Sequence, residues 1–275
     1  MIVNIDGNFV TQAEARIPVS DGGFLYGDTL FETIAIGDGR LHFRREHLER
    51  LHHAAQLCEF PWPHALINTA LDAVLERFGT RAGKLRLTLS RGDYHGPVRP
   101  PLTSGRVVIT ASETTTDFSA ECQLGIDCIA APNRRVNPLA PLPQLKRGNY
   151  QDCLYALHHA RRRGAFEALF ITQTGHVLEG ATSNLFIVRN ETLITPPPGE
   201  LVLAGIVRSQ VLRAAAELDI PCVESAISVA ALAGAEEAFI CNSLVGLLPI
   251  ARWQGGTLHR GTLHQQLSAR IENYP

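Results

Sequence analysis

Hydrophobic and polar positions in the first part of the chain alternate in short runs that predict β-strands. The segments "MIVNID", "TLFETIAI" and "RLHF" have this character, and the last two lie on either side of "GDG", which favours a hairpin. Further on, "KLRLTLSRG" places a leucine at every second position, and "GRVVITAS" is a more continuously apolar run. We therefore expect a sheet in this part of the chain.

Two segments between these strands follow a helical period instead. In residues 44–58, Leu48, Leu51, Ala55 and Cys58 fall on one helical face. Residues 64–79 predict a second helix, which Gly79 would end in the C′ position.

The second part of the chain carries many closely spaced strand patterns. It begins with a strand, "CQLGIDCIA", and an arginine- and proline-bearing loop, "APNRRVNPLAPLPQ". A helix is expected at 149–163 and another at 206–219, directly after "LAG". Between and after them, "EALFITQ", "GHVLEGA", "NLFIVRN", "TLITP" and "EEAFICNS" predict strands. The pattern is that of an α+β protein rich in antiparallel pairing, not of an alternating βαβ array.

The domain boundary is expected at a polar segment without periodicity, "SETTTDFSAE" at 112–121. We accordingly predict a smaller α/β domain over 1–113, a linker at 114–121 and a larger domain over 122–275, whose core would be barrel-like.

Composition excludes several classes of function. The chain has 275 residues, 45% of them hydrophobic, and a formal charge of −2, which gives no electrostatic reason to expect a nucleic acid or an anionic membrane as partner. Its six cysteines show no CxxC or zinc-type spacing, and we expect reduced thiols. Neither a signal peptide nor an apolar run long enough to span a bilayer is present, so a cytoplasmic protein is expected. The paired histidines His52–His53 and His158–His159 do not share a helical face, and no metal site is expected.

One lysine stands out among the cations. The chain has 25 lysines and arginines, of which only Lys84 and Lys146 are lysines. Lys146 follows the proline-rich loop and precedes the helix predicted at 149–163. Arginine would serve equally as a surface charge, but only an amine that can lose its proton forms a Schiff base with an aldehyde. The alternative is an ordinary solvated lysine.

A carboxylate and a phosphate site would complete an aldehyde cofactor site with a pyridine ring. Glu179, in "GHVLEGATSNLF", could keep a pyridine nitrogen protonated, so that the ring acts as an electron sink. In "LAGIVRSQVL", Gly205 allows close approach of the backbone, and the N–H groups of Ile206 and Val207 open a helix that could bind phosphate. The alternatives are that Glu179 caps a hairpin and that "LAG" is an ordinary helix cap.

Further phosphate donors are expected from two other segments. In "FICNSLVG", Asn242 and Ser243 end a strand with an amide and a hydroxyl. Arg50, in "HLERL", would add a charge-assisted hydrogen bond.

These segments, in this order, resemble the class IV aminotransferase family, the fold-type IV pyridoxal-phosphate enzymes. The resemblance rests on "DGGFLYGDTLFETI", "HLERL", "LKRGNY", "LEGATSNLFIV", "LAGIVR" and "ICNSLVGLLPI", and it covers nearly the whole chain. The family includes branched-chain and D-amino-acid aminotransferases and aminodeoxychorismate lyase. It implies a two-domain fold, pyridoxal 5′-phosphate as cofactor and a homodimer.

The resemblance also implies roles for individual residues. Lys146 would be the Schiff-base lysine and the base that moves the substrate proton, and Glu179 would pair with the pyridine nitrogen. Arg50, Ile206, Val207 and Ser243 would hold the phosphate, with Gly205 and Asn242 beside them. Tyr150 falls where several relatives place a tyrosine against the phenolic oxygen of the cofactor; its alternative is packing in the helix.

The choice of reaction depends on details within the family. "ICNSLVGLLPI" is most similar to the lyases, whereas "YGDTLFETI" fits both lyases and D-amino-acid aminotransferases. Lyases commonly carry "RG.GGRGY" and "KHLNR", where this chain reads "SRGDYHGPVRPP" and "KRGNY". We expect a lyase that converts 4-amino-4-deoxychorismate into pyruvate and 4-aminobenzoate, a folate precursor. The alternative is an aminotransferase that acts on branched-chain or D-amino acids.

The loop at 90–101 is the expected substrate-binding segment. It brings Arg91, His95 and Arg99 close together in the sequence, and these cations, with Tyr26, could bind the carboxylates of a small amine substrate. The loop could also reach the site of a neighbouring subunit, or be a solvated turn. A non-enzymatic scaffold that had lost the cofactor is a further alternative, which the presence of Lys146 and Glu179 disfavours.

Overall fold

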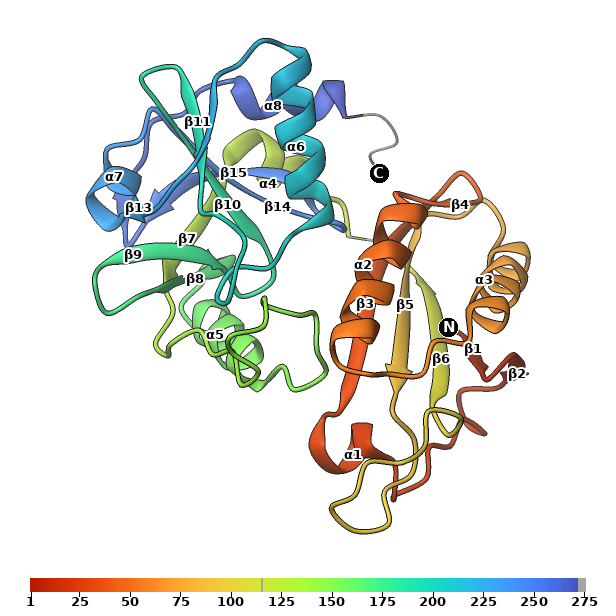
Figure 1. The fold of residues 1–275 in the computed structure, drawn as a ribbon. Coiled ribbons are helices and arrows are strands. Elements are labelled where there is room, and N and C mark those ends of the chain that lie inside the picture. Colours follow the sequence, from red (N-terminus) through yellow and green to blue (C-terminus); the bar gives the residue numbers. More distant parts are fainter. Residues whose placement is uncertain (115, 272–275) are drawn as a thin grey trace. The chain divides into compact units, whose positions relative to one another are not determined.

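The computed structural model describes residues 1–114 and 116–271, which form two compact units (Figure 1). Unit 1 consists of Met1–Thr116 and the short segment Leu145–Tyr150. Unit 2 consists of Asp117–Gln144 and of the described residues from 151 to 271. The division falls inside the linker expected at 114–121, but the segment around Lys146, which sequence analysis assigned to the larger domain, packs with unit 1.

Unit 1 is built on an antiparallel sheet with the strand order β2-β1-β6-β5-β3-β4. Its strands are β1 (Ile2–Ile5), β2 (Asn8–Val10), β3 (Thr29–Gly37), β4 (Arg40–Leu41), β5 (Gly83–Ser90) and β6 (Arg106–Glu113). The long pairs β3–β5 and β5–β6 continue over eight residues each, and they carry the alternating segments "TLFETIAI" and "KLRLTLS".

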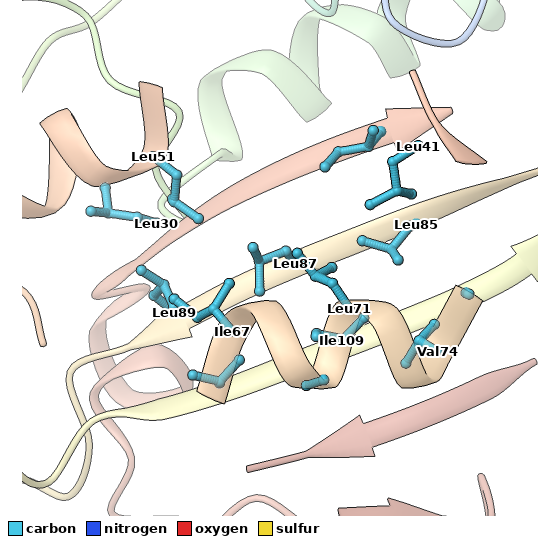
Figure 2. Close-up of a cluster of buried hydrophobic side chains, with 14 of the residues drawn as sticks. Leu30, Leu41, Leu51, Ile67, Leu71, Val74, Leu85, Leu87, Leu89 and Ile109 are labelled. Atoms are coloured by element: carbon cyan, nitrogen blue, oxygen red, sulfur yellow. The ribbon is translucent and has the colours of Figure 1, made fainter. Parts of the chain in front are cut away.

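Two helices, α2 (Arg44–Leu57) and α3 (His64–Phe78), share a hydrophobic core with this sheet, while the short helix α1 (Gly22–Tyr26) precedes β3. In Figure 2, Ile67, Leu71 and Val74 of α3 point toward the leucines of β5. Every second residue of β5, from Leu85 to Leu89, belongs to this core. Burial of these side chains, at about 1.5–3 kcal/mol each, is what holds the helices on the sheet.

The opposite face of the sheet has a polar composition. Because partners in an antiparallel register share a face, Phe31, Thr33, Arg86 and Thr88 lie on the side away from the helix core. We call this side the open face of unit 1. It is the face on which Lys146 lies, as shown below.

Unit 2 is built on a long, curled sheet with the order β12-β11-β10-β14-β15-β7-β8-β9-β13, to which β16 adds beside β15. Most pairs are antiparallel; β11–β12, β15–β7 and β7–β8 are parallel. The strands are β7 (Ile126–Ala130), β8 (Glu167–Ile171), β9 (His176–Gly180), β10 (Asn184–Arg189), β11 (Thr192–Thr195), β12 (Cys222–Glu224), β13 (Ile227–Ser228), β14 (Glu237–Asn242), β15 (Gly246–Trp253) and β16 (Gly256–Thr257). A second apolar core lies on this sheet.

The helices of unit 2 lie between and after these strands. They are α4 (Ser119–Leu124), α5 (Gln151–Arg161), α6 (Ile206–Glu217), α7 (Val229–Ala233) and α8 (Leu263–Arg270). The strand expected over "CQLGIDCIA" is wrong in its first half, since α4 extends through Leu124 and β7 begins only at Ile126. Within the described residues, no helix is both long enough and apolar enough to cross a membrane.

Candidate active site

Lys146 is fixed against the edge of β3 by backbone hydrogen bonds. The carbonyl of Lys146 accepts from the N–H of Phe31 at 2.9 Å, and Gly148 donates to the carbonyl of Thr29 at 2.7 Å. Leu30 and Arg147 form an antiparallel bridge in this stretch. Because Leu30 points into the helix core, the alternation of side chains places Lys146 on the open face.

Aromatic rings surround the amine of Lys146 on that face. Its Nζ lies 4.7 Å from the centre of the Phe31 ring and 5.9 Å from that of Tyr150. The two rings meet edge to face, with their centres 5.6 Å apart. The two rings shield part of the amine from water, and it is the neutral form of a lysine amine that reacts with an aldehyde.

A second cation, Arg86, shares the Phe31 ring. Its guanidinium carbon lies 3.6 Å from the ring centre, and its Nε donates to Thr88 at 3.2 Å. The Arg86 side chain reaches solvent, yet enough protein atoms surround the guanidinium to lower its pKa from the ordinary value, against the opposing effect of Tyr150. Within the described residues Arg86 forms no ion pair with a carboxylate of the chain.

Arg50 lies in a buried charge cluster between α2 and β3, and the charge of Lys146 is close enough to help lower the pKa of His47 in that cluster. Its Nε and Nη2 donate to the two carboxylate oxygens of Glu32 at 2.7 and 2.6 Å, and Nδ1 of His47 lies 2.7 Å from Glu32 Oε2. Glu32 and His47 are fully buried, whereas Arg50 is partly exposed. Helix α2 thus presents Arg50 and His47 to one glutamate of β3.

The pKa values of this cluster follow from burial and pairing. Burial by itself would raise the pKa of Glu32, but Arg50 and His47 outweigh it and lower that pKa to about 2. Burial lowers the pKa of His47, and the hydrogen bond to Glu32 only partly opposes this. Glu32 is therefore an anion at neutral pH, and His47 is neutral.

Glu179, at the end of β9, occupies a second buried cluster in unit 2. Its Oε1 accepts from Nε and Nη2 of Arg135 at 3.0 and 2.9 Å. Its Oε2 accepts from the backbone N–H of Leu203 at 2.9 Å and from the side-chain amide of Asn184 at 3.3 Å. Both oxygens of the Glu179 carboxylate therefore accept hydrogen bonds, which fix the orientation of the group.

The turn that follows Glu179 is clamped by another buried glutamate. Glu167, at the start of β8, accepts hydrogen bonds from the N–H and hydroxyl of Thr182, the hydroxyl of Ser183 and the N–H of Ala168. A side chain at Gly180 would collide with this arrangement, since an added Cβ would lie 2.3 Å from the Ser183 hydroxyl. Burial raises the pKa of Glu167, against the effect of these hydrogen bonds.

The beginning of α6 offers backbone donors. Gly205 is the N-cap residue in an extended conformation, and it provides no side-chain cap. In the part of the chain that the structure describes, the N–H groups of Ile206 and Val207 have no hydrogen-bond acceptor, although both residues are buried. Buried orphan donors at the positive end of a helix are typical of an anion site.

Asn242 and Ser243 lie where β14 ends. The side-chain oxygen of Asn242 accepts from the N–H groups of Leu244 and Val245, and its amide donates to the carbonyl of Thr182. Asn242 therefore joins the β14–β15 turn to the turn after Glu179, and Ser243 is the next residue in that turn.

The residues of the expected substrate loop are not joined to one another. Arg91 is buried, where it pairs with Asp28 at 2.7 Å and donates to the carbonyls of Cys58 and Glu59. Arg99 is exposed and pairs with Glu59, and His95 is exposed. Within the described residues no hydrogen bond links these three side chains, so their role in substrate binding stays a prediction, and for Arg91 the geometry favours a structural role.

Tyr26, also expected to contact substrate, is largely exposed at the end of α1. Its ring meets that of Tyr94 edge to face at 5.3 Å, and the hydroxyl of Tyr94 donates to Asp28.

The structure therefore distributes the predicted site residues over both units. Unit 1 contributes Lys146, Tyr150, Arg50 and the substrate-loop residues, and unit 2 contributes Glu179, Gly205, Ile206, Val207, Asn242 and Ser243. Sequence reasoning missed the partners Glu32, Arg86, Arg135 and Glu167. Glu32 had a visible signal, because it interrupts the apolar series Leu30, Ile34 and Ile36 on the inward face of β3.

Comparison with known proteins gives one consistent family. The model of the amino-transferase class IV family matches residues 29–253. A putative branched-chain-amino-acid aminotransferase of Methanocaldococcus jannaschii is 30% identical over 99% of this chain and 96% of its own length.

Two solved structures are similar across nearly the whole chain. The 4-amino-4-deoxychorismate lyase of Pseudomonas aeruginosa has a TM-score of 0.88 and 28% identity, covering 98% of each chain. The branched-chain amino acid aminotransferase of Escherichia coli has a TM-score of 0.87 and 28% identity, covering 97% of this chain and 91% of its own. The α+β, fold-type IV architecture expected from the sequence is confirmed by both. This chain belongs to the class IV aminotransferase family, an enzyme family that uses pyridoxal 5′-phosphate.

Proposed function

We propose that this chain holds pyridoxal 5′-phosphate through Lys146 and Glu179, as the residues present fit that group. The amine of Lys146 lies against the Phe31 and Tyr150 rings, a setting that suits reaction with an aldehyde. Glu179 is a buried carboxylate in a fixed orientation, which suits a hydrogen bond from a protonated pyridine nitrogen. We assign Tyr150 to the phenolic oxygen.

The orphan N–H groups of Ile206 and Val207 carry the assignment of the phosphate. Buried donors without acceptors are costly by about 1–3 kcal/mol each unless a ligand satisfies them. We assign Ser243 and Arg50 as further donors, with Gly205 and Asn242 shaping the site. Glu32 fixes the orientation of the Arg50 guanidinium, so that the arginine is held in place before the phosphate arrives.

We further propose that the enzyme is a 4-amino-4-deoxychorismate lyase that releases pyruvate and 4-aminobenzoate for folate synthesis. The bound cofactor would supply an electron sink for the carbon that bears the substrate amine. Lys146 would take the proton from that carbon, and its position beside Phe31 keeps it within reach of one face of the substrate. Expulsion of the enolpyruvyl group as pyruvate then leaves an aromatic ring.

The observation that carries this choice is the similarity to the solved lyase of Pseudomonas aeruginosa, which extends over 98% of both chains. The segment "ICNSLVGLLPI" supports it through its resemblance to lyases, and it forms the β14–β15 hairpin, which contacts the turn after Glu179.

Arg86 is the cation that we assign to the substrate carboxylate. Arg86 and Lys146 both lie against the Phe31 ring. The distance between the two cations is therefore at most the sum of their distances to the ring centre. A substrate that has both an amine and a carboxylate can then place its reacting carbon about 3–3.5 Å from the lysine nitrogen and its carboxylate against the guanidinium of Arg86. Arg86→Gln should raise KM for the substrate far more than it lowers kcat, whereas Arg45→Gln, an exposed control on α2, should change neither.

The experiment mixes purified, cofactor-loaded protein with 4-amino-4-deoxychorismate and follows 4-aminobenzoate by fluorescence and pyruvate by a coupled assay. The two products should appear in equal amounts and only in the presence of protein. Lys146→Ala protein should give neither, and Lys84→Ala protein should retain the activity. Yellow, cofactor-loaded protein that releases no product would contradict the lyase assignment.

Transamination is the second candidate, because curated relatives with 30% identity are named branched-chain-amino-acid aminotransferases. A panel of L- and D-amino acids with 2-oxoglutarate or pyruvate as acceptor distinguishes the two. Keto-acid formation from branched-chain or D-amino acids, without lyase activity, would assign the enzyme to this class.

We also propose a homodimer. Large apolar side chains are exposed in the stretch before β3 of unit 1, which is unusual for a surface that stays in water. They are Ile17, Val19, Phe24, Leu25 and Tyr26. Light scattering after size exclusion should give twice the chain mass of 30.0 kDa, and a monomer at assay concentration would contradict the proposal.

A further inference from the structure

One arginine in unit 2 serves two buried carboxylates. Arg135 contacts Glu179 through Nε and Nη2 and Asp152 through Nη1 at 2.8 Å. The side chains of Arg135, Asp152 and Glu179 are only 5%, 10% and 4% exposed, so all three charges are removed from bulk water. Interactions between charges are strong in such a place.

The guanidinium of Arg135 is fixed on every side. The side-chain oxygen of Gln144, in its hydrogen-bonded orientation, accepts from Nη2 at 2.7 Å. Cys153 Sγ lies 2.8 Å from Nη1, and the ring of Phe170 lies beneath the guanidinium at 5.3 Å. The cation therefore cannot turn away from Glu179 when the charge of that carboxylate changes.

The contact between Arg135 and Glu179 affects which of two groups, the carboxylate or a pyridine nitrogen, holds the proton that they share. A carboxylate and a pyridine nitrogen in hydrogen-bond contact share one proton, and in an apolar setting burial raises the proton affinity of the carboxylate toward that of the nitrogen. A cation held against the carboxylate lowers its proton affinity again. The proton then moves to the partner on the other side of the hydrogen bond.

We propose that Arg135 is a positioning residue that keeps the proton shared by Glu179 and the cofactor ring on the ring nitrogen. The inference rests on the proposed function, in which Glu179 pairs with that nitrogen. It adds that Glu179 alone is insufficient to keep the ring nitrogen protonated. The strength of the electron sink would then depend on Arg135, which acts through Glu179.

Asp152 completes the arrangement. Asp152 is a second carboxylate on Arg135, and its charge adds to the attraction that a protonated ring beside Glu179 would experience.

The test is nitrogen-15 NMR of the holoenzyme loaded with cofactor labelled at the ring nitrogen, because protonated and neutral pyridine nitrogens resonate at widely separated positions. The wild-type protein should show the protonated position at neutral pH. Arg135→Gln should move the signal to the neutral position, and Arg135→Lys, which keeps a cation, should restore the protonated one.

Arg106→Gln is the matched control. Arg106 also bridges two carboxylates, Asp21 and Asp93, but in unit 1 and beside no residue assigned to the cofactor. Its loss should leave the ring signal unchanged. If Arg135→Gln protein does not fold, the double variant Arg135→Gln/Asp152→Asn removes the arginine together with its second carboxylate and should show the same neutral signal.

Two results would overturn the proposal: a neutral ring nitrogen in the wild-type protein, or a protonated one in the Arg135→Gln proteins. These are distinct from failure of the proposed function, which would appear as wild-type protein that takes up no cofactor.

Discussion

Each unit of the molecule buries a glutamate against an arginine, but the two clusters differ in their balance of charge. In unit 1, Glu32 pairs with Arg50, and His47 is neutral. In unit 2, Glu179 and Asp152 share Arg135. The arginine therefore faces one carboxylate in the first cluster and two in the second.

The difference teaches what each cluster is suited to do. A neutral pair has no electrostatic demand for a further charge, and it serves to hold Arg50 at one orientation on α2. Two buried carboxylates that share one arginine are suited to a further cation, such as the protonated ring that we propose for Glu179. The Glu32–Arg50 pair is suited to preorganisation of the arginine.

Replacing Arg135 with methionine should have the largest effect on stability. The substitution leaves Glu179 and Asp152 buried without their cation, so we expect a loss of about 3–5 kcal/mol in the free energy of unfolding of the cofactor-free protein at neutral pH. Urea unfolding measures it. The loss should shrink as the pH falls, because both carboxylates can then take up protons; a loss independent of pH would contradict the charge argument.

Replacing Glu32 with leucine breaks the neutral cluster and should have the next largest effect. Arg50 is partly exposed and can turn toward water, so we expect a loss of about 3 kcal/mol, near the lower end for a broken buried pair. The double variant Glu32→Leu/Arg50→Met should recover most of it in urea unfolding. A double variant as unstable as the single one would mean that packing, not charge, dominates here.

The Glu32–Arg50 cluster also predicts how the stability of the protein decreases at low pH. The pKa of Glu32 is lowered from 4.5 to about 2, so its contribution to stability is complete above 4.5 and is lost as the pH falls toward about 2. Subtracting the acid unfolding curve of Glu32→Leu from that of the wild type should isolate this window. A difference that stays constant as the pH falls from 4.5 to about 2 would show that the pairing does not lower the pKa of Glu32.

Replacing Glu167 with glutamine tests the support of the Glu179 turn and should cost less. The amide nitrogen would face donors from Thr182 or Ser183, so we expect a loss of about 1–3 kcal/mol. Thermal unfolding measures it, with Glu76→Gln in α3 as an exposed control. Wild-type stability in Glu167→Gln would mean that the turn is held without this carboxylate.

The smallest effect is expected at His42, a buried histidine of unit 1 without a hydrogen-bond partner for its ring among the described residues. Burial lowers its pKa below 6.5. The unfolded chain therefore binds a proton that the folded chain refuses, and stability is lost as the pH falls below 6.5 toward the folded pKa. In His42→Leu, the drop in melting temperature from about pH 7.5 to about pH 5 should be smaller than in the wild type. An equal drop would rule out this histidine as its source.

The elements of unit 1 were predictable because their patterns are long. Residues 44–58 and 64–79 follow a helical period, and α2 and α3 end within a residue of those bounds. The short helix α4 could not be found this way, since six residues give too few turns for a period and Cys122 and Leu124 fit a strand equally well.

From the sequence, the candidate site could be proposed as a set of residues, whose roles stay predictions, but not as a set of contacts. Lys146 and Glu179 were recognisable from composition and motif. The partnership of Glu179 with Arg135 joins residues 44 positions apart, and nothing local determines it. The interpretation of the 90–101 loop as a substrate-binding segment rests on sequence proximity and stays a prediction, whereas the alternation of Leu85, Leu87 and Leu89 already indicates that Arg91 lies on the inward face.

The central claim is that Lys146 bonds covalently to the cofactor, and the chain permits a direct test because it has only two lysines. The holoenzyme is reduced with borohydride, digested and analysed by mass spectrometry. We predict that the peptide containing Lys146 carries the reduced cofactor, and that the peptide containing the exposed Lys84 is unmodified. Label on Lys84 alone, or on neither lysine in yellow protein, would contradict the account.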